Sequence, residues 1–379
     1  MTAKVLHLKA KNRTPENTIA NLEDFDYEEG ELIDPLIIIN QSNITLYCLD
    51  FNQEQAIFVE TPPHLDLSQF PFFYLAQYDN AQRLIAVPWN DLFQLVEARE
   101  QFKQLIVIYS VGRCGSTLLS QMFNQVDTVL SLSEPDVFSQ LVGLRNLERS
   151  NDREILKLLK ACLFFIGKQS LHNKSSCLVI KLRSFAIELG DLIKQAFPNT
   201  QSIFLYRNAE EMVKSSIRAF GFLNELLPKI EENIDFYSRF IPLLKDYKNN
   251  LKLSPNKAVD FYTIMWLSVM ERYIYLNQQR KINIAIRYED LVAKPEKIIT
   301  WLFQELGLPI TQVSEAYQLL NHDSQEGSNL SKQKTHYNQV ENLNSLEICN
   351  QVNNLLKQHP IITKSDFIVP DTLGYTHQT

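Results

Sequence analysis

The spacing of hydrophobic positions changes near residue 102 and divides the chain into two parts. Before this point, short runs rich in β-branched and aromatic residues alternate with polar, turn-like segments, as antiparallel strands do. The runs predicted to be strands cover residues 35–40, 43–50, 55–60, 72–79 and 83–88. A helix is predicted at 90–101, with Asn90 as its N-cap. We therefore expect residues 1–101 to form a β-rich accessory unit.

From residue 103 onward, near-continuous apolar runs alternate with helix-length segments. Such runs are typical of strands buried on both faces, and they cover residues 103–110, 177–182, 202–206 and 282–288. Helices are predicted at 116–126, 185–197, 209–220 and near 343–357. This alternation predicts a parallel sheet with right-handed crossovers. Amphipathic stretches at about 221–280 predict a helical insertion before the last strand.

Composition and charge narrow the class of protein. Hydrophobic residues make up 45% and charged residues 21% of the 379, so the chain can bury a full core. The formal net charge is −7, which argues against a general nucleic-acid binder. Five cysteines without CxxC spacing argue against a disulfide framework or structural zinc. No apolar run resembles a signal peptide or a membrane span, so we expect a cytoplasmic protein that binds neither nucleic acid nor membrane.

A buried strand is joined to a helix by the glycine loop VGRCGST. Glycine is scarce in this chain, at 10 residues, yet Gly112 and Gly115 lie close together here. A strand that leads through such a loop into a helix directs backbone N–H groups and the helix dipole at one point, which suits a phosphate. Ser116 and Thr117 add hydroxyl groups, and Arg113 adds a cation. No lysine follows the last glycine, so the loop differs from a Walker A motif.

This loop resembles the 5′-phosphosulfate loop of the sulfotransferases that use 3′-phosphoadenosine 5′-phosphosulfate (PAPS). The resemblance implies a P-loop-type three-layer α/β/α fold for residues 102–379, with a central parallel sheet and the helical insertion, next to the N-terminal β-rich unit. It also implies a cofactor-binding role for the loop residues Arg113, Cys114, Gly115, Ser116 and Thr117.

A second anion site is predicted downstream. Arg207 follows the run 202–206, at the carboxyl end of a strand, where α/β sheets bind ligands. Asn208 and Glu211 are predicted to form a capping box that opens the next helix. Ser215 lies eight residues after Arg207. A strand-end arginine followed eight residues later by a serine resembles the 3′-phosphate motif of the same family.

Two later segments extend the resemblance. Residues 286–309 resemble the strand and helix that the family carries around a YEDL sequence, and their role is predicted to be structural. A polar stretch then follows where family members close a loop over the cofactor. It supplies Ser328 and Lys332 as further candidate cofactor ligands.

Sulfuryl transfer is an in-line displacement that requires neutralisation of the leaving phosphate and removal of the acceptor proton. Arg113 is the first candidate cation. Lys181 is the second, since it aligns with the lysine that precedes the catalytic histidine by two residues in cytosolic sulfotransferases. Arg183 stands at the histidine position, and a guanidinium cannot accept a proton.

Glu134 is the preferred general base. It lies 21 residues after Arg113, the same offset as the catalytic glutamate in tyrosylprotein-type sulfotransferases. An equally weighted alternative is a helix start in which Ser133 is the N-cap, Pro135 lies in the first turn and Asp136 is at N3. The fallback bases are the histidines His172, His322 and His336.

The resemblance therefore implies a sulfotransferase that moves a sulfuryl group from PAPS to a hydroxyl or amine of a small-molecule acceptor, such as a natural product. The leaving group is a phosphate, so no metal is required. The alternatives are a P-loop nucleotide-dependent kinase with Asp290 as a Mg²⁺ ligand, and a non-catalytic nucleotide-binding scaffold. The predicted acceptor walls are the N-terminal β-rich unit and the aromatic residues Phe236, Tyr237, Phe240, Phe261, Tyr262 and Trp266.

Overall fold

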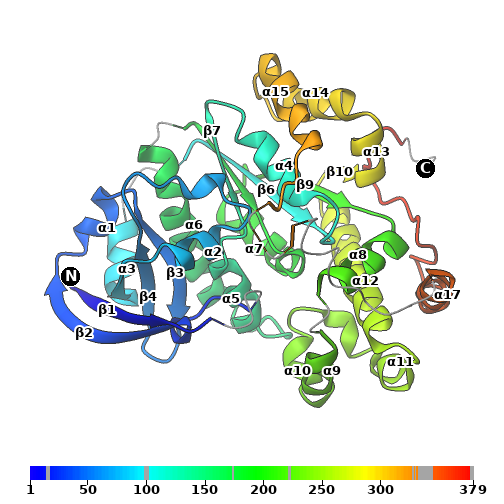
Figure 1. Cartoon of the computed structure of the whole chain (residues 1–379), viewed down its shortest axis with the longest axis horizontal. Coiled ribbons are helices and arrows are strands. Elements are labelled where there is room, and N and C mark those ends of the chain that lie inside the picture. The colour runs from blue at the N-terminus through cyan, green and yellow to red at the C-terminus, as the bar shows by residue number, and fades with distance from the viewer. Residues whose placement is uncertain are drawn as a thin grey trace.

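Two five-stranded sheets form the framework of the protein (Figure 1). The computed structural model describes residues 1–13, 18–97, 102–172, 175–220, 223–326, 328, 330–331 and 345–375. Within these residues the N-terminal sheet is antiparallel and the second sheet is parallel. This mixed α/β architecture confirms the predicted fold class.

The antiparallel sheet has the strand order β2-β1-β5-β4-β3. Its strands are β1 (Ala3–Lys11), β2 (Phe25–Ile33), β3 (Ile44–Asp50), β4 (Gln55–Glu60) and β5 (Arg83–Pro88). The last three confirm predicted strands, whereas β1 and β2 were not predicted. The exposed edge strand β2 carries few apolar residues. Its pairing depends on β1, including ion pairs such as Lys4–Glu29, rather than on a local hydrophobic run.

Two predicted strands are wrong. Residues 35–40 contain helix α1 (Leu36–Asn40), and residues 72–79 contain helix α2 (Phe73–Asp79). Both runs are short and almost wholly apolar, and such runs do not distinguish a buried strand from a buried helix. In α1 only Ile38 is fully buried, because a single helical turn presents one residue to the core.

The parallel sheet has the order β10-β9-β6-β8-β7. Its strands are β6 (Gln104–Ser110), β7 (Val129–Ser133), β8 (Cys177–Lys181), β9 (Gln201–Tyr206) and β10 (Ile284–Arg287). Four of them confirm predictions. Strand β7 was not predicted, because it is short and its two serines interrupt the apolar run, yet every residue in it is buried.

Helices flank this sheet and form the insertion. The helices predicted after three strands are confirmed as α4 (Ser116–Phe123), the pair η3 (Ser184–Leu189) and α7 (Gly190–Ala196), and α8 (Ala209–Ala219). Helix α3 (Trp89–Val96) has Pro88 at its N-cap, so Asn90 as a cap is wrong. In the described part of the chain, the other α-helices are α5 (Val137–Leu144), α6 (Asp152–His172), α9 (Leu223–Glu232), α10 (Ile234–Tyr237), α11 (Lys248–Leu253), α12 (Lys257–Gln278), α13 (Tyr288–Ala293), α14 (Pro295–Glu305), α15 (Val313–Gln318) and α17 (Ser345–Leu356).

One hydrophobic core joins the two sheets. Phe58 of β4 and Ile85 of β5 belong to the same buried cluster as Ile106 of β6. The ring centroids of Phe58 and Phe165 of α6 lie 5.0 Å apart. The division into units at residues 101 and 102 stays a prediction. Among the described helices, none combines the length and apolar character needed to cross a bilayer.

Candidate active site

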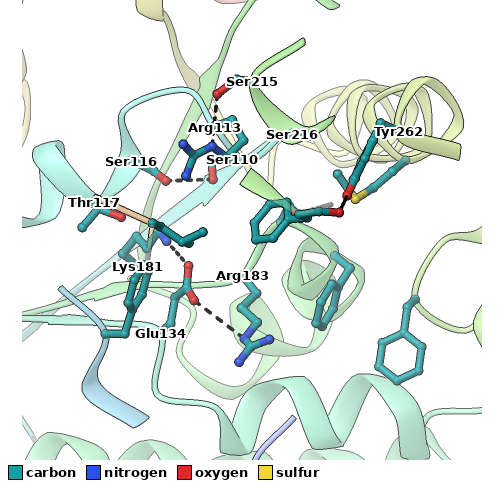
Figure 2. A pocket seen from close by; sticks show the side chains of 18 of the residues that line it. Ser110, Arg113, Ser116, Thr117, Glu134, Lys181, Arg183, Ser215, Ser216 and Tyr262 are labelled. Carbon is teal, nitrogen blue, oxygen red and sulfur yellow. Dashed lines mark hydrogen bonds and ion pairs between the residues drawn. The ribbon is translucent and has the colours of Figure 1, made fainter. Parts of the chain in front are cut away.

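The carboxyl ends of the five parallel strands meet at one cavity of about 770 Å³. Figure 2 shows side chains that line it. Each strand delivers a lining residue at or just after its end: Arg113 after β6, Glu134 after β7, Lys181 on β8, Arg207 after β9 and Tyr288 after β10. Ligands bind at this edge in open α/β sheets. The fold therefore brings together the charged groups that the sequence placed on separate segments.

The loop between β6 and α4 has an unusual backbone. Gly112, Arg113 and Gly115 have φ values of +79°, +50° and +80°. A Cβ on Gly115 would lie 2.7 Å from Cε2 of Tyr288, so both its φ and its surroundings require glycine. No side chain caps the N-terminus of α4, where Gly115 is the N-cap. The first-turn N–H groups of α4 are thus available to an anion.

The side chains of this loop divide between the cavity and the core. Ser116 and Thr117 line the cavity, and the hydroxyl of Ser110 donates to Ser116 Oγ at 3.2 Å (Figure 2). Cys114 is fully buried and its thiol donates to the carbonyl of Leu205. A role of Cys114 toward a ligand is therefore limited to its backbone N–H.

Three arginines converge beside the loop. The Nε of Arg113 donates to Ser215 Oγ at 3.2 Å, and Nη1 of Arg207 donates to the Arg113 carbonyl at 3.2 Å. Arg218 also lines the cavity and was missed from the sequence, although it follows Ser215 by one helical turn. Burial and then the positive charges of Arg207 and Arg218 lower the pKa of the Arg113 guanidinium. An anion between the arginines would offset this repulsion.

The start of α8 fixes Arg207. The side chain of Asn208 accepts from the N–H groups of Glu210 and Glu211, which confirms Asn208 as the N-cap. The predicted reciprocal bond from Glu211 is wrong. Glu289 Oε1 accepts from the Asn208 N–H at 3.0 Å instead, while Glu211 Oε2 lies 3.6 Å from Arg207 Nη2.

Glu134 lies between two cations. Lys181 Nζ donates to Glu134 Oε1, and Arg183 Nε lies 3.7 Å from Glu134 Oε2 (Figure 2). Burial raises the pKa of Glu134, but the charges of Lys181 and Arg183 outweigh this effect and hold the pKa below its ordinary value. Glu134 is therefore a carboxylate at neutral pH.

The helix-start alternative for this segment is wrong in its details. Ser133 is the last residue of β7, and α5 begins at Val137 with Asp136 as its N-cap. The Glu134 N–H donates to the Lys181 carbonyl at 2.7 Å, which extends the β7–β8 pairing by one residue. This pairing carries Glu134 to the cavity edge.

The segment after η6 (Leu319–Asn321) lies against the loop. Gln325 Oε1 accepts from Arg113 Nη1 at 2.9 Å, and Asp323, Ser324 and Gln325 line the cavity. Ser328 donates to the Gln325 carbonyl and does not line the cavity, so its predicted role stays a prediction. Lys332 lies outside the described residues.

The fallback histidines gain no support. His322 is exposed and does not line the cavity. The side chain of His172 and the whole of His336 lie outside the part of the chain that the structure describes.

Most of the remaining cavity wall is apolar and aromatic. Of the six predicted wall residues, Phe236, Tyr237, Phe240, Phe261 and Tyr262 line the cavity. The sixth, Trp266, is fully buried behind it and donates to the Arg207 carbonyl. The N-terminal segment contributes Ile19, Phe72 and Tyr74, which the sequence did not single out individually.

A family model described as "Sulfotransferase family" matches residues 105–312 of the chain. Among solved structures, the chain is similar to the sulfotransferase domain from the curacin biosynthetic pathway, at 16% identity over 67% of this chain and 98% of that chain, with a TM-score of 0.37. It is also similar to the sulfotransferase domain from the Synechococcus PCC 7002 olefin synthase, at 15% identity over 68% of this chain and 96% of that chain, with a TM-score of 0.37. A third similar structure is the sulfotransferase from Alicyclobacillus acidocaldarius, at 13% identity over 56% of this chain and 83% of that chain, with a TM-score of 0.32. A search of curated proteins found no match.

Proposed function

Because the chain belongs to the sulfotransferase family, we propose that it transfers a sulfuryl group from PAPS to a hydroxyl or amine of a small-molecule acceptor by in-line displacement. The observation that carries the proposal is the convergence of Arg113, Arg207 and Arg218 on a glycine loop that opens an uncapped helix. Such a cluster suits a ligand with more than one anionic group.

The residues present fit the two phosphate-bearing ends of PAPS. The loop N–H groups, with the hydroxyls of Ser116 and Thr117, would hold the 5′ end. Arg207 and Ser215 would hold the 3′-phosphate. The lining residues include five cations and two carboxylates, namely Arg113, Lys181, Arg183, Arg207, Arg218, Glu134 and Asp323. This excess of positive charge favours a polyanion.

When bound, PAPS would supply the sulfuryl group and a phosphate leaving group. Arg113 and Lys181 would stabilise the negative charge that develops on the leaving side. Glu134 would accept the proton of the acceptor, since it is ionised and lies at the cavity edge between Lys181 and Arg183.

The apolar wall supports a largely hydrocarbon acceptor. Rings from α10, α12 and the N-terminal unit face the same cavity as Glu134. Burial of apolar surface against these rings would supply binding energy. The acceptor hydroxyl or amine would then lie toward Glu134 and Lys181.

Calorimetric titration with 3′-phosphoadenosine 5′-phosphate (PAP) tests the cosubstrate. We expect PAP to bind without Mg²⁺ and ATP to bind far more weakly. ATP binding that is as tight and requires Mg²⁺ would favour the kinase instead. Asp290, its candidate Mg²⁺ ligand, does not line the cavity, so no observation favours that function.

Two variants test catalysis. Lys181→Ala should abolish transfer of labelled sulfate while PAP affinity stays nearly unchanged. Wild-type protein that binds PAP but sulfates no acceptor would support the non-catalytic scaffold.

Glu134→Gln should lower turnover by about 10²-fold or more with little change in PAP affinity. Near-normal turnover would remove Glu134 from the mechanism.

A further inference from the structure

Arg183, at the position of the family's histidine, makes contacts that tie Glu134 to its neighbours. Its Nε lies 2.8 Å from Asp136 Oδ1, and its Nη2 donates to Asp136 Oδ2 at 3.0 Å. The same guanidinium lies 3.7 Å from Glu134 Oε2. Arg183 thus bridges two carboxylates that are two residues apart in the turn between β7 and α5.

The N-terminal unit holds the far side of Asp136. The Ala20 N–H donates to Asp136 Oδ2 at 2.6 Å, and Arg13 Nη2 lies 3.9 Å from the same oxygen. The Arg13 side chain is completely buried, and it is held by Asp24 at 2.6 Å and by the Tyr47 hydroxyl at 2.9 Å. Contacts therefore run from the antiparallel sheet to the candidate base.

Tyr74 of α2 joins the two arginines a second time. The Cζ atoms of Arg183 and Arg13 lie 4.5 Å and 4.8 Å from the centre of its ring. Tyr74 also lines the cavity. The N-terminal unit is therefore in contact with both the acceptor wall and the ion pairs behind it.

The network contains three cations and three carboxylates, with side chains at most 14% exposed: Lys181, Arg183, Arg13, Glu134, Asp136 and Asp24. Burial of so many charges costs desolvation energy, and replacement of buried ion pairs by apolar residues is often neutral or stabilising. Stability alone therefore does not explain the network. The network lies directly behind Glu134, and this position indicates a role in holding that side chain.

We infer that Arg183 and Asp136, held by Arg13 of the N-terminal unit, are positioning residues that orient Glu134 toward the acceptor. The inference rests on the proposed function of the same site. It makes the N-terminal unit a required part of the active site rather than an independent accessory.

The charge of Arg183 affects the pH at which Glu134 is protonated. The groups that interact with Glu134 are Lys181 of β8, Arg183 after β8, Arg113 of the loop and Tyr74 of α2. Asp136, two residues after Glu134, pairs with the same Arg183. Loss of the Arg183 charge leaves Lys181 and Arg113 to oppose the effect of burial, so the Glu134 carboxylate should then protonate at higher pH.

The test compares wild-type protein with Arg183→Gln and Arg13→Gln. The pH titration of Glu134 is followed in ¹³C-glutamate-labelled protein by carboxyl-carbon NMR, with Glu134→Gln to assign the signal. This readout needs neither PAPS nor turnover. Arg183→Gln should raise the titration midpoint of Glu134 by about one pH unit. Arg13→Gln should raise it by less.

The kinetic readout separates positioning from binding. In both variants kcat should fall about tenfold, the acid limb of kcat/KM should move to higher pH, and the dissociation constant of PAP should change little. Arg183→Lys, which restores the charge without the fork, should recover the pH profile but only part of kcat. If Arg183→Gln does not fold, Arg183→Lys and Arg13→Gln still test whether the two arginines position Glu134.

Arg145→Gln is the matched control, because Arg145 is a buried arginine that pairs with Asp152 and Asp191, outside this network. It should lower stability without moving either pH profile. If the Arg183 and Arg13 variants behave in the same way, the inference is wrong. Failure of wild-type protein to bind PAP would instead overturn the proposed function and leave the NMR test standing.

Discussion

At the residue scale, two side chains of the candidate active site belong to residues with left-handed backbone. Arg113 and Glu134 have φ values of +50° and +58°, which cost non-glycine residues free energy. Both follow the carboxyl end of a parallel strand and line the cavity. Strain of this kind concentrates at functional sites, where surrounding contacts hold it in place. The surrounding structure here is the strand pairing of β7, β8 and β6.

Gly115→Ala should destabilise the protein more than Gly307→Ala. Both glycines have positive φ, at +80° and +69°, so each alanine carries a left-handed penalty of about 1–2 kcal/mol. Only at Gly115 would the added Cβ also lie 2.7 Å from the Tyr288 ring, whereas nothing lies within 4 Å at Gly307. Urea unfolding of both variants measures the difference. Equal losses of unfolding free energy would contradict this account of the loop.

Arg207→Ala should weaken PAP binding by about 10- to 100-fold, because a charge-assisted hydrogen bond contributes about 1.5–3 kcal/mol. Arg207→Lys should recover only part of the affinity, since an ammonium lacks the planar fork. Titration calorimetry gives the dissociation constants. The control is Arg149→Ala, an arginine that pairs with Asp191 and does not line the cavity. It should bind PAP like the wild type, and a similar loss there would point to a general charge effect.

At the element scale, a buried lysine joins α6 to α1 of the N-terminal unit. Lys168 Nζ donates to the carbonyls of Ile38 and Gln41, at the C-terminal end of α1. Burial lowers the pKa of Lys168 to about 7, from 10.5 in an unfolded chain. Between these two pH values the unfolded chain binds more protons than the folded protein. The contribution of Lys168 to stability therefore rises with pH across this window.

Lys168→Met should remove this pH dependence. Wild-type protein should gain stability relative to the variant by at most about 1.4 kcal/mol per pH unit between pH 7 and pH 10. Urea unfolding of both proteins at pH 7, 8 and 9 measures the gain. Lys357→Met, at an exposed lysine, is the control and should track the wild type. A constant difference between wild type and Lys168→Met would show that Lys168 stays protonated in the folded protein.

At the scale of the whole molecule, parts that are distant in sequence share one cavity. The ends of the parallel strands and helix α8 supply most of the charged groups, while the N-terminal unit and the insertion supply apolar walls. The chain carries a net charge of −7, yet the cavity collects an excess of cations. Positive potential is therefore local to the site, where it would attract an anionic ligand.

The apolar walls predict a preference for acceptors without a charged tail. The compounds 4-ethylphenol, tyramine and 4-hydroxyphenylacetate carry the same phenol and differ mainly in the charge of the tail. We expect 4-ethylphenol to have at least about a tenfold higher kcat/KM than the other two, because an unpaired charge is costly to bury against hydrocarbon. Labelled-sulfate transfer measures the three rates. Equal or better use of tyramine would place an unrecognised carboxylate at the tail site.

Features that depend on the local pattern of residues could be predicted from the sequence. Buried parallel strands appear as apolar runs, and the glycine loop with its arginine and hydroxyls lies in one short segment. The match of residues 105–312 to the sulfotransferase family confirms the resemblance inferred from that loop. Arg207 and Ser215 could be predicted to lie near each other because they belong to one strand end and the helix that follows it.

Features that depend on contacts between distant segments of the chain could not be predicted and became visible in the folded protein. Strands β1 and β2 pair with each other, and β7 pairs with β8. Two short apolar runs form the helices α1 and α2 rather than strands, because packing against the core determines their conformation. The ion pair between Arg13 and Asp136 joins residues more than a hundred positions apart in the sequence. Pattern along a chain reports how a residue meets its near neighbours, whereas pairing, burial and charge balance depend on which distant segments pack together.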